Sequence, residues 1–184
     1  LTEKLFNPAG FMKVDADYTT KTFDQWVPND WPKTYQTSFK NIFAIGSGVL
    51  AGVGLGRNIQ AMLISRGLIE MIYFGKAMGA EPEDFLGTAG VGDLIATATS
   101  TQSRNYMFGT RLGKGEKFNE IMKTMPELAE GVRTLKISQE LAKHYKLHVP
   151  ITSMLYNIVY NNLNIDRAIN MLMSYPFNID VDFL

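Results

Sequence analysis

Residues 58–78 place apolar side chains around most of the circumference of a predicted helix. They include Leu63, Ile69 and Phe74. A helix at the surface of a protein keeps a polar face toward water, so a helix that is apolar on nearly all sides is typical of the inside of a bundle. We therefore expect this segment to be buried among other helices.

Most of the remaining chain also shows the three-to-four-residue spacing of apolar side chains that predicts helices. One such run extends from Phe39 to Val49, after Pro32, a residue favoured in the first turn of a helix. Further helices are predicted at residues 81–85, 93–99, 104–112, 116–125, 132–145, 152–161 and 166–173. The fold class that we predict is therefore all-α, a multi-helix, bundle-like domain.

A single strand is predicted near the start of the chain, where residues 11–17 alternate apolar and polar side chains after a Pro-Ala-Gly turn. Residues 19–30 are polar with aromatic interruptions, as expected of a connector. We predict two parts, a strand with its linker over residues 1–30 and a helical domain over residues 31–184. The tail after Pro176 is expected to be irregular.

Charge and composition exclude several classes of function. The 18 basic residues balance the 18 acidic ones, so no net field attracts the chain to nucleic acid or to an anionic membrane. The absence of cysteine excludes disulfides and a cysteine nucleophile, and it fits a reducing cytoplasm. No signal-peptide pattern and no apolar run near the roughly 20 residues of a membrane helix is present. We expect a cytoplasmic globular protein, and Leu1 in place of Met predicts that the chain does not begin at its natural start.

Several polar groups interrupt the apolar pattern, and they are candidate site residues because burial of an unpaired charge is costly. Lys40 and Asn41 lie between Phe39 and Ile42. A solvated or snorkelling lysine is the alternative at this position. Asp93 follows Gly-Val-Gly at the start of a predicted helix, where an N-cap is the alternative role.

Ser103, Arg104 and Asn105 begin another predicted helix. Backbone N–H groups at a helix N-terminus, the helix dipole and a guanidinium together suit a phosphate group. A capping serine beside an exposed arginine explains the same residues equally well. Glu130 and Gly131 precede a further helix, where a cap or a turn is the alternative.

Two glycine-rich segments and two histidines are excluded as sites. Residues 46–48 and 52–56 resemble fragments of a nucleotide loop, but a dinucleotide fingerprint follows a strand and has a different spacing. We assign these glycines to helix packing and a tight turn. His144 and His148 supply fewer ligands than a zinc site needs, so we expect them at the surface and predict no metal site.

Seven motifs follow one another along residues 39–173: KNIFAIG at 40–46, GLGRN at 54–58, RGLIEM at 66–71, GVGDL at 90–94, QSRN at 102–105, EGVRT at 130–134 and VPIT at 149–152. In this order they resemble the C-terminal, substrate-binding domain of bacterial-type NAD(P)-dependent glycerol-3-phosphate dehydrogenases.

The resemblance implies reversible, NAD(P)H-dependent reduction of dihydroxyacetone phosphate to sn-glycerol 3-phosphate for glycerophospholipid synthesis. Reduction of a ketone requires a proton at the carbonyl oxygen, and Lys40 would donate it while Asp93 orients the ammonium. The substrate-binding residues so implied are Lys40, Asn41, Asp93, Thr97, Ser103, Arg104 and Asn105, and the cofactor contacts are Arg104, Leu128 and Glu130. These roles require Lys40, Asp93 and Arg104 to converge on one pocket.

The resemblance also implies that a Rossmann domain holds most of the NAD or NADP. Residues 5–14 resemble the last strand of that domain, so its phosphate-cradling loop would lie upstream and we expect this chain alone to be inactive. The implied partners are a small phosphorylated substrate and the Rossmann domain, with a homodimer left open. The chain departs from the family pattern at Thr37-Ser38-Phe39, Arg57 and Gln60, where the family usually has Gly-Ala-Leu, an acid and a lysine.

Two alternatives remain open. One is the helical domain of a related two-domain dehydrogenase that acts on hydroxy acids, which phosphate binding would distinguish. The other is a non-catalytic helical module for dimerisation or ligand binding, because broad apolar helices can form a dimer face as well as a core.

Overall fold

A computed structural model describes residues 31–125 and 129–174, with side chains from Ser38 onward. All regular structure in these residues is helical, which confirms the predicted fold class. The predicted strand at 11–17, Leu128 and the tail after Pro176 lie outside the described residues. Among the described helices, none combines the length and hydropathy needed to cross a membrane.

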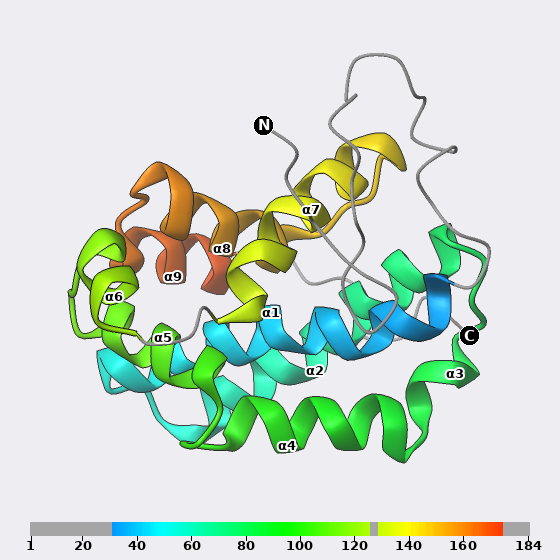
Figure 1. Ribbon diagram of the computed structural model, residues 1–184, viewed down its shortest axis with the longest axis horizontal. Helices are drawn as coiled ribbons and strands as arrows, with labels where there is room; N and C mark the ends of the chain where they lie inside the picture. The colour runs from blue at the N-terminus through cyan, green and yellow to red at the C-terminus, as the bar shows by residue number, and fades with distance from the viewer. Residues whose placement is uncertain (1–30, 126–128, 175–184) are drawn as a thin grey trace.

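The helices follow the predicted order, with boundaries within about two residues of most predicted ones. In chain order they are α1 (Trp31–Val53), α2 (Arg57–Ala77), α3 (Glu83–Leu86), the π-helix η2 (Thr88–Gly92), α4 (Asp93–Thr99), α5 (Arg104–Gly113), α6 (Phe118–Thr124), α7 (Glu130–His144), α8 (Pro150–Asn161) and α9 (Ile165–Met173). Figure 1 shows α1 crossing the middle of the domain with the other helices arranged around it.

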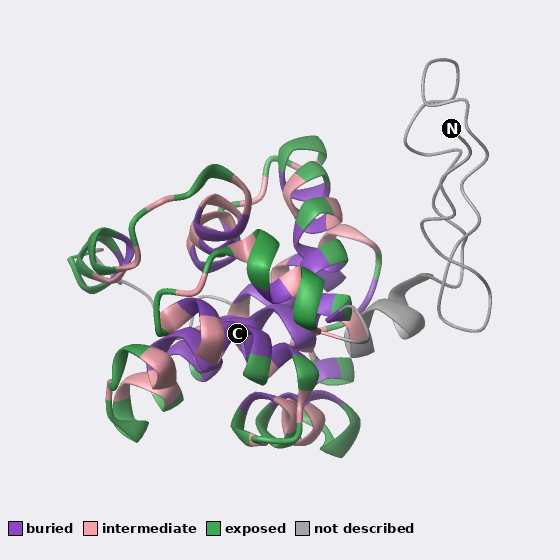
Figure 2. Ribbon diagram, turned by 60° about the vertical axis from the view of Figure 1, so that its left-hand side comes forward, coloured by how far each residue is buried: buried purple, intermediate pink, exposed green. Residues whose placement is uncertain are grey.

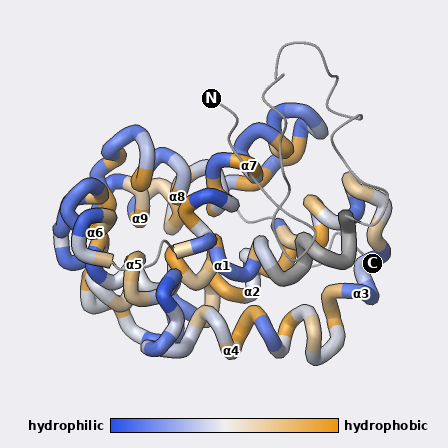
Figure 3. The backbone as a smooth tube through the Cα atoms, viewed as in Figure 1, coloured by the Kyte–Doolittle hydropathy of each residue, from blue (hydrophilic) through white to orange (hydrophobic). Residues whose placement is uncertain are grey.

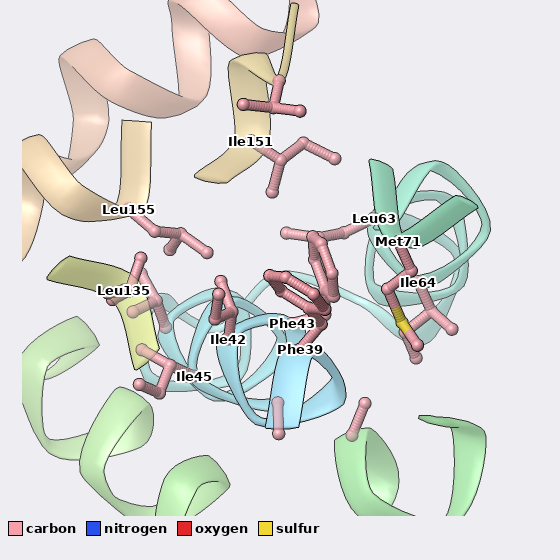
Figure 4. Packing of buried hydrophobic residues seen from close by; sticks show 14 of the residues in the cluster. Phe39, Ile42, Phe43, Ile45, Leu63, Ile64, Met71, Leu135, Ile151 and Leu155 are labelled. Atoms are coloured by element: carbon pink, nitrogen blue, oxygen red, sulfur yellow. The ribbon is translucent and has the colours of Figure 1, made fainter. Parts of the chain in front are cut away.

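Helix α1 is the most enclosed element of the described chain. It packs against α2, α4, α5, α7 and α8, and every residue from 41 to 50 is buried. Figure 2 shows this helix in purple among neighbours whose outer turns are exposed. In Figure 4, Phe39, Ile42 and Phe43 of α1 face apolar side chains from α2, α7 and α8.

Helix α2 is less enclosed than its sequence predicts. Leu63, Met71 and Phe74 are buried, but Ala61 and Ser65 are exposed. The broad apolar surface of α2 is covered on one side by α1, α4 and α8 and stays partly open on the other. Figure 3 shows hydrophilic and hydrophobic residues alternating along α7 and α9, as expected of helices that each bury one face.

Glycines allow α1 and α5 to touch backbone to backbone. A Cβ atom at Gly48 would lie 2.1 Å from the carbonyl oxygen of Tyr106, and one at Gly109 would lie 2.0 Å from that of Ile45. The turn after α1 uses Gly54, whose φ of +89° favours glycine. The prediction that these glycine-rich segments serve packing and a turn is therefore confirmed for the described residues.

A buried carboxylate joins α2 to α8. Glu70 accepts hydrogen bonds from the backbone N–H groups of Ile151 and Thr152, at 2.6 and 2.9 Å, and from the Thr152 hydroxyl at 2.7 Å. It therefore caps the N-terminus of α8 from a helix that lies 82 residues earlier in the chain. Burial raises the pKa of the Glu70 carboxyl to about 7, and the three hydrogen bonds limit that rise.

We expect Gly48→Ala to lower the free energy of unfolding by about 1–3 kcal/mol or more, because its methyl group must push α1 and α5 apart. Gly56→Ala is the matched control, because a Cβ there meets nothing within 4 Å. Urea unfolding of both variants measures the difference. Equal stability of the two variants would contradict the close approach of α1 and α5.

Ionisation of Glu70 should make the domain less stable as the pH rises. The folded carboxyl, with its pKa of about 7, binds its proton more tightly than the unfolded one at 4.5, so stability is highest below pH 4.5, falls as the pH rises toward 7 and levels off above it. The difference is on the order of 3 kcal/mol. Urea unfolding across this range should show a flatter pH profile for Glu70→Gln, and parallel profiles would refute the effect.

Candidate functional site

Lys40 and Asp93 form an ion pair although they lie 53 residues apart in the sequence. The Lys40 ammonium donates a hydrogen bond to Oδ2 of Asp93, and the two side chains are 19% and 33% exposed. The Thr97 hydroxyl lies 3.5 Å from the other carboxylate oxygen, Oδ1. The structure thus places an amine, a carboxylate and a hydroxyl together at the half-buried surface between α1 and α4.

The π-helix η2 positions Asp93. Gly90 lies in this turn, and a Cβ atom there would meet the carbonyl oxygen of Phe85 at 2.1 Å, so the turn packs tightly onto α3. Asp93 follows as the first residue of α4, where Gly92 occupies the cap position. The alternative that Asp93 is an N-cap is therefore wrong, and its carboxylate is directed to Lys40 and Thr97.

A second set of contacts joins the start of α7 to α1 and α5. The side-chain amide of Asn41 donates to Oε2 of Glu130 at 3.3 Å. Oδ1 of Asn105 accepts from the backbone N–H of Gly131 at 2.8 Å. A Cβ atom at Gly131 would lie 2.7 Å from the Asn41 carbonyl oxygen, so glycine is required for this approach. Since Asn41 follows Lys40 in α1, the two sets of contacts adjoin.

The first turn of α5 carries the predicted phosphate-binding residues. The Ser103 hydroxyl caps the helix by accepting from the Tyr106 N–H at 3.4 Å, so the capping interpretation of this serine is confirmed. Arg104 is exposed at the first helical position. Asn105 is buried, and because its oxygen is occupied by Gly131, its NH₂ group is the part left for a ligand. Leu128 lies outside the described residues.

The sequence singled out the charged and amide groups but did not predict that Gly90 and Gly131 bring them together. The cap or turn predicted at Glu130 and Gly131 is wrong, because α7 begins at Glu130 and Ala129 occupies the cap position. Gly90 shapes the turn before Asp93, and Gly131 lets α7 approach α1. Gly90 shares a motif with Asp93, and Gly131 directly follows Glu130. This closeness to candidate site residues was the signal in the sequence that could have revealed the role of the two glycines. His144 and His148 are exposed as expected, and the described residues contain no cluster of three metal-ligating side chains.

We expect Asn105→Ala to lower the free energy of unfolding by about 1–3 kcal/mol, because it leaves the buried N–H of Gly131 without an acceptor. Asn161→Ala is the control, since Asn161 is exposed and bonds only along its own helix. Amide hydrogen exchange at Gly131 should accelerate only in Asn105→Ala. Unchanged exchange in that variant would show that Asn105 does not hold α7.

Comparison with known proteins gives one consistent family. Residues 34–170 match the family model described as NAD-dependent glycerol-3-phosphate dehydrogenase C-terminus. Glycerol-3-phosphate dehydrogenase (NAD(P)+) of Leuconostoc mesenteroides is 50% identical over 139 residues, covering 76% of this chain and 41% of that protein. The protein of the same name from Enterococcus faecalis is 44% identical over 136 residues, covering 74% and 40%.

A crystal structure of glycerol-3-phosphate dehydrogenase from Coxiella burnetii superposes with a TM-score of 0.75 at 34% identity, over 78% of this chain and 44% of that one. The chain spans about two fifths of the length of the curated relatives that it matches. The chain belongs to the family of C-terminal domains of NAD-dependent glycerol-3-phosphate dehydrogenases.

Proposed function

We propose that this chain is the substrate-binding part of an enzyme that interconverts dihydroxyacetone phosphate and sn-glycerol 3-phosphate, supplying glycerophospholipid synthesis in the cytoplasm. The observation that carries the proposal is the ion pair of Lys40 with Asp93, next to Thr97, at a half-buried surface. An ammonium held by a carboxylate provides a proton donor of fixed position, which reduction of a ketone needs.

Lys40 would hold the substrate's carbonyl oxygen and give it a proton from Nζ. An ammonium has three N–H donors, and Asp93 uses one of them, so donors remain for the substrate oxygen. In the reverse reaction the same nitrogen takes the proton from the alcohol. Asp93 would keep the amine in place through both directions, and Thr97 would limit rotation of the carboxylate.

Ser103, Arg104 and Asn105 would bind the substrate phosphate. The N-terminus of α5 provides backbone N–H groups and the positive end of a helix dipole, the exposed Arg104 provides a guanidinium, and Asn105 offers its NH₂ group. Asn41, which follows Lys40 in α1, would also bind the substrate through its polar side chain. Binding energy from the phosphate would position the distant carbonyl carbon for reaction.

We propose that Arg104 and Glu130 contact one end of the dinucleotide. Glu130 is exposed and has one carboxylate oxygen engaged by Asn41, and Arg104 is exposed at the start of α5. Together with Leu128 they would contact NAD or NADP, which when bound in its reduced form supplies the hydride and in its oxidised form accepts it. The larger part of the cofactor would be held by a Rossmann domain, the chain's proposed partner, and a homodimer is a further proposed assembly.

Titration of this chain with sn-glycerol 3-phosphate, followed by NMR of backbone amides, tests the proposal without any cofactor. We expect shifts at Asp93, Asn105 and Gly131, and none with glycerol or lactate at the same concentration, because the phosphate supplies most of the affinity. Arg104→Gln should weaken binding several-fold, whereas Arg133→Gln, an exposed arginine on α7, should not.

Two results of this titration would contradict the proposal. Equal shifts with glycerol or lactate would favour a dehydrogenase of unphosphorylated hydroxy acids. If the ligand shifts no amide of α4 or α5, the phosphate binds elsewhere and not beside the pair of Lys40 and Asp93.

A further inference from the structure

A cavity lies at the C-terminal end of α1, away from the pair of Lys40 and Asp93. It has a volume of about 680 Å³ and opens between the end of α1, the turn from α5 to α6, and the junction of α8 with α9. These elements meet at the left of Figure 1. Val53 lines it, and the rise of a helix places Val53 about 20 Å along α1 from Lys40. The cavity is therefore separate from the proposed active site.

The floor of the cavity is apolar. Leu112, Phe118 and Ile158 line it, and the first and last of these are almost fully buried. Gly52 and Gly113 also line it, at the point where α1 and α5 touch, since a Cβ atom at Gly52 would lie 2.3 Å from the Thr110 carbonyl oxygen. This close crossing of the two backbones therefore forms one wall of the cavity.

The rim of the cavity carries an excess of positive charge. Lys114 and Lys117 line it together with the carboxylates of Glu116 and Asp166. Glu116 is already neutralised, because Arg111 donates to it through both Nε and Nη2, at distances down to 2.6 Å. That pairing lowers the pKa of Glu116, and the nearby charge of Lys114 adds to the effect. Two lysines thus face one unpaired carboxylate.

We propose that this cavity binds an amphipathic anion, a molecule with an aliphatic chain and one carboxylate or phosphate group. The chain would lie on the apolar floor, and the headgroup would meet the ammonium groups of Lys114 and Lys117 at the rim. The volume is within the roughly 300–1,000 Å³ of pockets that hold small ligands. The proposal does not depend on the proposed dehydrogenase function, because these residues take no part in it.

The test is titration of the 184-residue chain with dodecanoate below its micelle concentration, without nucleotide or substrate, by calorimetry and NMR. Dodecanoate should bind and shift the amides of residues 113–118 and 162–166. Acetate, which lacks the chain, and dodecyltrimethylammonium, which reverses the charge, should not. Dodecyl phosphate is compared with dodecanoate to distinguish the two headgroups. The one that binds more tightly shows whether the cavity prefers a phosphate or a carboxylate.

Variants at the rim make the test specific. The double change Lys114→Gln and Lys117→Gln should weaken dodecanoate binding on the order of tenfold. The control pair is Lys123→Gln and Lys136→Gln, two exposed lysines that do not line the cavity. Circular dichroism confirms that each variant is folded. Equal affinity in both double variants, equal binding of the cationic amphiphile, or shifts confined to residues outside the cavity would each overturn the proposal.

Discussion

The close approach of helices to α1 is the constraint on which the described structure depends. Gly48 and Gly109 remove the side chains that would separate α1 from α5, so the two backbones touch. Ten successive residues of α1 are buried as a result. A helix fixed on all sides has little freedom to shift, so Lys40 and Asn41, which lie where this enclosure begins, are held in a defined position.

Close approach of backbones at glycines also occurs where the candidate site is assembled. Gly90 lets the π-helix pack onto Phe85 and directs Asp93 toward Lys40, and Gly131 lets α7 approach Asn41. Polar contacts then set the arrangement, with the Asn105 carboxamide tying α7 to α5. The proposed chemistry therefore rests on close packing of backbone, because glycines bring α1 against α5, η2 against α3 and α7 against α1.

The sequence predicted the helices well because apolar spacing is a local property, and most ends agree within about two residues. It also singled out Lys40 and Asp93, which the structure joins in an ion pair, through their conflict with an apolar surface and through the family motifs. The burial of α2 was overestimated, since an apolar helix does not reveal how many neighbours cover it. The contact of Glu70 with Thr152 and the π-helix before Asp93 were not foreseen, because both depend on segments that meet only after folding.

A double-mutant cycle on Lys40 and Asp93 tests the convergence of α1 and α4 most directly. Lys40→Met, Asp93→Asn and the double variant are compared with the unchanged chain by their free energies of unfolding. If the ion pair exists, the two single changes are not additive, and the coupling is on the order of 1 kcal/mol for side chains of this partial exposure. Additive effects, with no coupling, would show that the two groups do not meet and would remove the basis of the proposed site.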